Sequence, residues 1–531
     1  MLAGGNKNNL FLNPPQNGED GWIASGIGIK SNKHTSSIFT EKDWSNNLDT
    51  LNNIDGHFVL VKWSNKKLFI ETDPIGLRDI YISENENEIL FSTRVDWLAK
   101  AHKLKINFNE FGSRWLLFNQ ISNDSVFFDV ERIVAGKKAS ISLNGHDVKY
   151  YNYNWLPDEQ TKEIEIDEFS EILKPLIFIG DKLSLGLSGG MDSRILLSFL
   201  LGEKINFGTF TFGSPDHPDS LMAETLVKDF NLQHKRYNAE LPSIEDLITK
   251  IKEYSTQTVV NNGASAIFQS LNYSLMHNKH SVLIDGCFGE IYRREFFYRL
   301  YFKGKKHILN KNAKEIIPHI ALPHADIFNN DINKLMSESI EAKLDFWFAS
   351  LPSAEKIGIE NWLDLFAIKT RMPNYFLHEQ NIIDNAVTSV MPFAQLSLLK
   401  TLFNIPVSYR KNGKLLRKLL KKNYPILEKY PLVKGNSTHP YSFNSFQSRI
   451  LSQLRKKTNK NIYQDNSRDI LLNKLKPYIL DISSLLDFKN SEIYDTQKVK
   501  KIIDGYYKGN SNYGYALDWW LSFELFRQNI G

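Results

Sequence analysis

Residues 182–194 read Lys-Leu-Ser-Leu-Gly-Leu-Ser-Gly-Gly-Met-Asp-Ser-Arg, and this stretch is more informative about the chain than any other. The alternating residues 182–187 predict a short strand, and an apolar helix is predicted to start near Ser193. Between them, the adjacent glycines of residues 188–190 let the backbone turn tightly and expose several N–H groups. Because the positive end of the helix faces the same space, the turn predicts an anion site.

Polar side chains in the same turn add to this prediction. Asp192 places a carboxylate beside the anion, where it could hold Mg²⁺ through oxygen ligands. Ser188 and Ser193 add hydroxyl donors. The turn lacks the Gly-Lys-Ser/Thr ending of the ordinary P-loop, so it predicts a nucleotide-phosphate loop of another kind. The plain alternative is a strand-turn-helix corner that happens to be rich in glycine.

The pattern Ser-Gly-Gly-x-Asp-Ser between a strand and a helix resembles the loop of the N-type ATP pyrophosphatases. These enzymes cleave ATP between the α and β phosphates, and the adenylyl group activates a carbonyl oxygen. The resemblance implies that ATP and Mg²⁺ are used and that the loop holds the departing pyrophosphate. The residues that it assigns to ATP and pyrophosphate are Leu187, Ser188, Gly189, Gly190 and Ser193.

Length and composition limit the number of domains and the class of protein. A chain of 531 residues predicts two or three domains, and 42% hydrophobic with 24% charged residues describes a soluble globular protein. No apolar run approaches the roughly 18 residues that span a bilayer, and the N-terminus lacks the build of a secretory signal. The single cysteine, Cys287, excludes an intramolecular disulfide and fits a reducing compartment, so the cytoplasm is predicted. A net charge of +5, with lysines clustered at 303–306, 418–422 and 456–460, predicts solvated helix faces rather than nucleic-acid binding.

The first half predicts an antiparallel domain. Residues 57–63, 67–72, 79–83 and 89–93 alternate or are rich in β-branched and aromatic side chains, and turn signals separate them. A further hairpin pairs 138–142 with 148–153 through Asn144-Gly145. Pro157 and the acidic stretch after it predict a linker, so we predict domains at 1–157 and 158–531.

Three segments of that half look like the sheet of a class II glutamine amidotransferase: Gly56-His57-Phe58, Asp73-Pro74-Ile75-Gly76 and residues 80–92. The resemblance implies an Ntn-type, β-sandwich-like domain whose N-terminal cysteine would release ammonia from glutamine. Here the chain starts Met1-Leu2-Ala3-Gly4, the domain has no cysteine, and no Asn-Gly-Glu segment is present to hold an amide. We therefore predict a structural remnant without glutaminase activity. A misplaced start codon is the alternative.

The second half predicts a doubly wound, Rossmann-like parallel sheet with extra helices, the adenine nucleotide alpha hydrolase type. A strand at 206–212 is followed by a helix at about 220–231, which repeats the strand-helix order of the phosphate loop. Ligands of such sheets bind at the carboxyl ends of strands. This places Thr211, Phe212 and Gly213 near the adenine.

A further predicted strand, 281–284, ends in Asp285-Gly286-Cys287-Phe288-Gly289-Glu290. The segment is similar to the Ser/Asp-Gly-x-Gly-x-Asp-Glu segment of asparagine synthetase-like enzymes. The resemblance assigns Gly286 to the nucleotide and makes Glu290 the metal partner of Asp192, while the next family acid is Ile291 here. The alternative is a strand-end turn stabilised by Asp285. Cys287 could be a nucleophile, but no histidine is close in sequence, so packing is predicted.

Two later segments separate this chain from its relatives. The family pattern Glu-x-Arg-x-Pro-Phe-Leu-Asp has Thr388, Val390 and Gln395 at its charged positions here. In contrast, residues 414–440 resemble the segment whose lysine neutralises pyrophosphate, which assigns Lys434 to catalysis with Asp192 and Glu290. Lys434 as an ordinary surface lysine is the alternative. In the tail, the aromatics at 519–523 are predicted to be core.

These resemblances predict an ATP-dependent, AMP-forming amide ligase of the asparagine synthetase superfamily. It would adenylate a small-molecule or peptide carboxylate and join it to ammonia or to an amine of the substrate. β-Lactam synthetases, lasso-peptide cyclases and amidating enzymes of surface-polysaccharide pathways are similar variants. One alternative is an ATP-binding pseudoenzyme or scaffold, favoured by the changes at Thr388, Val390 and Ile291. A tRNA-modifying enzyme with the same loop is a third reading, although paired cysteines and an RNA-binding module are missing.

Overall fold

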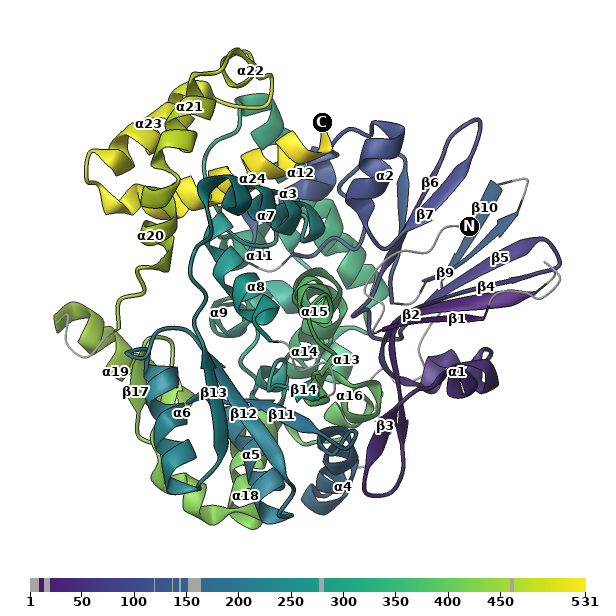
Figure 1. The fold of residues 1–531 in the computed structure, drawn as a ribbon, viewed down its shortest axis with the longest axis vertical. Coiled ribbons are helices and arrows are strands. Elements are labelled where there is room, and N and C mark those ends of the chain that lie inside the picture. The colour runs from purple at the N-terminus through teal and green to yellow at the C-terminus, as the bar shows by residue number, and fades with distance from the viewer. Residues whose placement is uncertain are drawn as a thin grey trace.

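The computed structural model describes residues 9–13, 20–118, 120–135, 137–142, 145–150, 164–276, 281–458 and 463–531. Within these residues the chain forms antiparallel sheets in its first part and a parallel sheet with many helices in its second (Figure 1). This confirms the predicted fold class of antiparallel first half and parallel second half. The predicted domain boundary between residues 157 and 158, and the start Met1-Leu2-Ala3-Gly4, lie outside the described residues.

The larger antiparallel sheet has the order β1-β2-β4-β5-β9-β10, with β3 paired to β2. Its strands are β1(Leu10–Asn13), β2(Gly21–Ser31), β3(Ser36–Ile38), β4(Asp55–Ser64), β5(Lys67–Thr72), β9(Lys137–Ser142) and β10(Gly145–Tyr150). The smaller sheet has the order β7-β6-β8, from β6(Ile80–Glu84), β7(Ile89–Ser92) and β8(Val130–Ile133). Apolar side chains from both sheets, including Ile70 and Ile82, form one buried cluster, because alternate residues of each strand point to the same face.

The parallel sheet has the order β13-β12-β11-β14-β15. Its strands are β11(Leu183–Gly186), β12(Phe207–Phe212), β13(Gln233–Tyr237), β14(Val282–Ile284) and β15(Ser389–Val390). In chain order this is 3-2-1-4-5, so the direction of winding reverses between β11 and β14, where Leu185 pairs with Ile284. The helix predicted near Ser193 begins earlier, at Met191, so Asp192 lies in its first turn.

Helices cover both faces of this sheet, as a doubly wound fold requires. Leu185 and Ile284 face a core shared with α4(Ile166–Ile177), α5(Met191–Gly202) and α18(Lys414–Asn423). On the other face, Phe210 and Leu283 pack with Tyr273 of α8(Ile267–Ser274) and Ile383 of α15(Leu377–Asp384). Figure 1 shows α5 and α18 together beneath the teal strands.

The remaining helices pack around the first core, against the antiparallel sheet or around a second core. They are α1(Glu41–Asn47), α2(Val95–His102), α3(Phe108–Leu116), α6(Pro218–Asp229), α7(Ile244–Gln257), α9(Tyr298–Lys303), α10(Lys305–Leu309), α11(Ala313–Ile320), α12(Asn330–Ser350), α13(Ala354–Ile357), α14(Ile359–Arg371), α16(Leu396–Leu402), α17(Val407–Arg410), α19(Ser445–Thr458), α20(Ser467–Lys474), α21(Lys476–Ser484), α22(Leu486–Lys489), α23(Thr496–Tyr507) and α24(Gly514–Ile530). Trp520 and Phe523 of α24 are fully buried there, which confirms that the aromatics of the tail are core. In the described part of the chain, no helix combines the length and the apolar character needed to cross a membrane.

Candidate functional site

The phosphate loop lies at the point where the winding of the parallel sheet reverses. Residues 187–190 connect β11 to α5, and the segment after β14 runs beside them. An added Cβ on Gly286 would lie 2.7 Å from Asp192 Cβ, and one on Gly289 would lie 2.4 Å from Asp192 Cγ. Only glycine lets the two loops come this close, so the structure brings Asp192 and the predicted Gly286 together.

Hydrogen bonds within the loop hold its hydroxyl groups in place. Ser188 Oγ and Ser193 Oγ are 2.9 Å apart, and the Gly190 N–H donates to Ser188 Oγ at 3.2 Å. The Gly189 N–H donates to the carboxylate of Asp219 at 2.7 Å. One backbone N–H of the loop, that of Gly189, thus already has a negatively charged acceptor.

Lys434 reaches the loop from a hairpin of β16(Leu432–Lys434) and β17(Ser437–His439). The Val433 N–H donates to the Gly189 carbonyl at 2.8 Å. The buried guanidinium of Arg194 donates to the carbonyls of Tyr430 at 2.6 Å, Pro431 at 2.8 Å and Gly189 at 3.2 Å. Arg194 therefore ties the loop to the strand that carries Lys434. Sequence reasoning did not assign it a role, although it ends the Asp-Ser-Arg run.

Four charged side chains form a chain across the site. Arg293 donates to both oxygens of Asp192, at 3.0 and 2.6 Å, and to Glu295 at 3.0 Å. Lys434 Nζ donates to the other oxygen of Glu295 at 2.7 Å. The side chains of Asp192, Arg293 and Glu295 are each 14% exposed, and that of Lys434 is 38% exposed. Lys434 is therefore an ion-paired residue of the site rather than an isolated surface lysine.

In this chain of ion pairs, burial and the neighbouring charges shift the pKa values in opposite directions. Burial raises the pKa of the Asp192 carboxyl, and the Arg293 guanidinium opposes that rise. Burial alone would lower the pKa of Arg293, but the carboxylates of Asp192 and Glu295 raise it. The two hydrogen bonds between Asp192 and Arg293 favour the charged form of both partners.

A cavity of about 290 Å³ lies over the loop and these ion pairs. Its lining includes Ser188, Gly190, Asp192, Asp219, Glu290, Arg293, Glu295, Arg417 and Lys434. Glu290 stands in the 3₁₀-helix η4(Gly289–Arg293), and its Oε2 is buried with no hydrogen-bond partner in the described part of the chain. The structure thus gathers the three predicted catalytic residues, Asp192, Glu290 and Lys434, around one cavity.

A larger cavity of about 1,020 Å³ opens on the other side of Ser188. The predicted adenine residues Thr211, Phe212 and Gly213 line it, and Thr211 Oγ1 donates to the Leu187 carbonyl at 2.6 Å. Cys287 is exposed in this cavity, so the prediction that it packs in the interior was wrong. Burial in the concave wall and the nearby carboxylate of Asp285 raise the pKa of the thiol, which disfavours a nucleophilic thiolate. The Cys287 N–H donates to Asp285 at 2.8 Å, so the strand-end turn is present as well.

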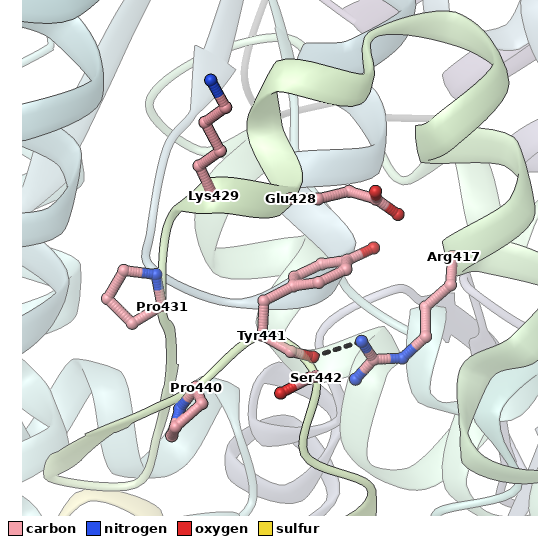
Figure 2. Close-up of a pocket in the computed structure, with 7 residues that line it drawn as sticks. All are labelled: Arg417, Glu428, Lys429, Pro431, Pro440, Tyr441 and Ser442. Carbon is pink, nitrogen blue, oxygen red and sulfur yellow. Dashed lines mark hydrogen bonds between the residues drawn. The ribbon is translucent and has the colours of Figure 1, made fainter.

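Arg417 joins the 290 Å³ cavity to a neighbouring cavity of about 570 Å³. Its guanidinium donates to the Tyr441 carbonyl and to the Phe443 carbonyl at 2.9 Å, and lies 4.5 Å from the centre of the Tyr441 ring (Figure 2). In Figure 2 the Tyr441 ring lies near the centre of the view, with Glu428 above it, Pro431 and Pro440 to its left and Arg417 to its right. Arg417 anchors the chain that follows the Lys434 hairpin.

The chain matches the model of a known family. Residues 181–429 match the family model described as asparagine synthase. This segment is similar to an asparagine synthase domain. It begins at β11 and ends in the 3₁₀-helix η8(Pro425–Lys429), so it contains Asp192 and Glu290, while Lys434 lies just beyond its end. The match confirms the resemblance that the phosphate loop predicts.

Other comparisons add little. One solved structure, the glutamine phosphoribosylpyrophosphate amidotransferase from B. subtilis complexed with ADP and GMP, is 11% identical over 52% of this chain and 63% of its own, with a TM-score of 0.17. A second, described as the allosteric regulatory enzyme of purine biosynthesis, is 12% identical over 55% of this chain and 59% of its own, with a TM-score of 0.17. This chain spans less than two thirds of either protein, and likeness at this level supports no conclusion. Proteins of curated function gave no match.

Residues 181–429 have uncharged side chains at four positions where the family pattern has charged ones. Ile291 and Val390 are fully buried, in η4 and β15. Gln395 is also buried and accepts a hydrogen bond from the Gly56 N–H at 2.8 Å, and Thr388 donates to Asn9 at 3.1 Å. Gln395 and Thr388 therefore hold the domain against the antiparallel sheets.

One carboxyl of the asparagine synthase domain was missed by sequence reasoning. Glu379 of α15 accepts a hydrogen bond from Asn262 at 2.8 Å, and burial raises its pKa to about 7. It follows the π-helix η5(Met372–Phe376), a helix irregularity that is frequent at functional sites. After burial and Asp285, the charge of Glu379 adds to the raised pKa of Tyr273 and of Cys287, both of which line the larger cavity. Its sequence neighbours His378, Gln380 and Asn381 are polar as well, so the local sequence does not single it out.

Proposed function

We propose that this protein is an ATP-dependent, AMP-forming amide ligase. The observation that carries the proposal is the single cavity over the phosphate loop, in which Asp192, Glu290 and Lys434 meet at the reversal point of a parallel sheet. The asparagine synthase domain at residues 181–429 supports the reaction class.

In the proposed reaction, a carboxylate oxygen of the substrate attacks the α-phosphate of ATP and pyrophosphate leaves. Ser188 and the Gly190 N–H would contact the leaving group, Ser193 would hold the Ser188 hydroxyl in place, and Lys434 would supply a positive charge. A placed cation lowers the barrier because negative charge grows on the leaving oxygen. The adenine then lies near Thr211, Phe212 and Gly213 in the larger cavity.

An amine completes the reaction by attacking the acyl-adenylate and releasing AMP. Its ammonium form must first lose a proton. Glu379 fits this role, because a carboxyl with a pKa of about 7 is half ionised near neutral pH. We propose that Glu379 takes over the task of the family glutamate, whose position is Thr388 here.

Mg²⁺ fits the carboxylates of the smaller cavity. The buried Glu290 Oε2 lacks a partner among the described residues, and a hard divalent cation satisfies such an oxygen. Asp192 and Glu290 would hold the ion, which would neutralise phosphate charge. No group of three or more His, Cys, Asp or Glu suited to a metal occurs within the described ranges, so phosphate oxygens would supply the other ligands.

The nitrogen would come from free ammonia or from an amine of the substrate. The sequence has no cysteine before residue 287 to serve as a glutaminase nucleophile. Where the two antiparallel sheets face each other, buried aliphatic side chains fill the space. We propose that the first half supports the fold and that lasso-type cyclisation or amidation of a sugar acid are variants of the same reaction.

An ATP-binding pseudoenzyme is the second candidate. Two contacts favour it: both Asp192 oxygens accept from Arg293, and the Gly189 N–H is taken by Asp219. A pseudoenzyme would bind ATP without releasing pyrophosphate with any carboxylate.

The deciding experiment measures AMP and pyrophosphate release from Mg-ATP with ammonia and a panel of carboxylates, aspartate first, with glutamine as an alternative nitrogen donor. Asp192→Ala should abolish release, and Asp181→Ala, an exposed aspartate before β11, should not. Release that needs a carboxylate supports the ligase. ATP binding without release throughout the panel supports the pseudoenzyme, and no ATP binding contradicts both.

A further inference from the structure

Arg293 occupies an unusual position between two carboxylates of the phosphate cavity. Its Nε and one terminal nitrogen donate to Asp192, and the other terminal nitrogen lies 3.0 Å from Glu295. The asparagine synthase resemblance gives this residue no role, and the proposed reaction does not use it. Arg293 nevertheless lines the same cavity as Ser188, Gly190 and Lys434.

To bind a triphosphate, this cavity needs a second cationic side chain that can move toward the phosphates. Asp192, Asp219, Glu290 and Glu295 line it, and a bare triphosphate would be repelled by them. Arg417 also lines the cavity, but its guanidinium is held by the Tyr441 and Phe443 carbonyls. Lys434 contributes one charge at one end of Glu295. Arg293 is held by side chains that a phosphate could replace, since guanidinium pairs with phosphate as well as with carboxylate.

We propose that Arg293 is a pyrophosphate-binding residue that stays ion-paired with Asp192 until the nucleotide enters. This inference rests on the proposed function. On binding, the guanidinium exchanges the Asp192 oxygens for phosphate oxygens and keeps its bond to Glu295. The exchange also releases the Asp192 carboxylate toward the divalent cation. No covalent bond changes in this step.

Glu295 is the positioning residue of this arrangement. One of its oxygens pairs with Arg293 and the other with Lys434, so a single carboxylate sets the spacing of the two cations. A guanidinium anchored at one edge retains its other edge for a bidentate contact. Arg293 and Lys434 would then approach the pyrophosphate from the same wall of the cavity.

The test compares ligand binding by Arg293→Gln, Arg293→Lys and a matched control, Arg299→Gln, which changes an exposed arginine in the first turn of α9. Titration calorimetry with inorganic pyrophosphate and Mg²⁺ should show binding roughly 10- to 100-fold weaker in Arg293→Gln and unchanged in the control, because a charged fork is lost. Affinity for AMP should be unchanged. Arg293→Lys keeps the charge opposite Asp192 and Glu295, so it guards against a folding defect and should give an intermediate loss.

A second measurement, metal affinity, should increase in Arg293→Gln where pyrophosphate affinity decreases. Mn²⁺ alone, measured by paramagnetic resonance without nucleotide, should bind Arg293→Gln more tightly than the wild type, because Asp192 is then released from its ion pair. A merely structural role would not strengthen metal binding. Pyrophosphate affinity equal to that of Arg299→Gln overturns the inference while the proposed function stands. Failure of the wild type to bind pyrophosphate or ATP overturns both.

Discussion

The Val433 N–H donates a 2.8 Å hydrogen bond to the Gly189 carbonyl, so the strand of Lys434 is bonded directly to the phosphate loop. The contact exists because Gly189 has no side chain: a Cβ there would lie 2.2 Å from Val433 Cγ2. The loop and the lysine behave as one unit through this contact, although Gly190 and Lys434 lie far apart in the sequence.

Gly189→Ala should push the Lys434 hairpin off the loop. The clash involves a packed valine, so we expect a loss of about 1–3 kcal/mol in the free energy of unfolding, as for other overpacked sites. ATP affinity should fall as well. Gly208→Ala in β12 is the matched control, since its Cβ would meet its nearest neighbour at 3.9 Å. Equal effects of the two substitutions in denaturant unfolding and ATP titration would contradict the prediction.

Arg194→Met should loosen the same unit without adding bulk. The substitution removes three donors from the carbonyls of Gly189, Tyr430 and Pro431 while it keeps an apolar stem. The Gly189 carbonyl keeps the Val433 N–H, but the Tyr430 and Pro431 carbonyls lose these donors, and a buried carbonyl left without a partner costs about 1–3 kcal/mol. We expect lower stability and faster amide hydrogen exchange at residues 430–434. Unchanged exchange there would show that Arg194 does not hold the hairpin.

Asp364→Asn should destabilise the segment that carries Arg293. Asp364 of α14 is fully buried and accepts hydrogen bonds from Arg294 and from Arg410. Losing the carboxylate leaves two buried cations without a counter-ion, which costs about 3–5 kcal/mol. Thermal unfolding measures this loss. Asp331→Asn, at an exposed site in the first turn of α12, is the control and should leave the unfolding temperature unchanged.

Glu379 predicts a pH dependence of stability with a defined sign. Its folded pKa, about 7, lies above the ordinary value of 4.5. Between these values the folded protein holds the extra proton, so rising pH lowers the stability of the wild type. The full shift corresponds to about 3 kcal/mol. Glu379→Gln cannot titrate, and its stability relative to the wild type should therefore increase from about pH 5 to about pH 8.

The same variant tests the proposed base. If Glu379 accepts the amine proton, wild-type turnover should rise as pH increases through about 7, and Glu379→Gln should lose most of this turnover while it still forms the acyl-adenylate. Pyrophosphate exchange into ATP reports the first half-reaction. A variant that is equally slow in exchange and in amide formation would assign Glu379 to folding alone.

Much of the fold was predictable where local pattern and burial agree. β5 matches its prediction residue for residue, and β12 differs at one end only, because alternating or apolar runs bounded by turns are strong signals. β13 was missed. Its sequence Gln-His-Lys-Arg-Tyr is polar because it lies at the edge of the parallel sheet, with one neighbour and exposed side chains. Edge strands of this kind lack the apolar run that identifies buried parallel strands.

Local sequence is enough to predict the phosphate loop, its glycines and its place between a strand and a helix, because these depend on contacts between near neighbours. Which charges meet at the loop follows only from the folded chain. Arg293 and Glu295 lie in the segment after β14, whereas Asp192 comes from α5 and Lys434 from β16, and no short-range pattern indicates that Glu295 pairs with both cations. Likewise, the raised pKa of Glu379 depends on what surrounds α15. Ion pairing and burial are set by packing between distant segments, so they follow from the folded chain.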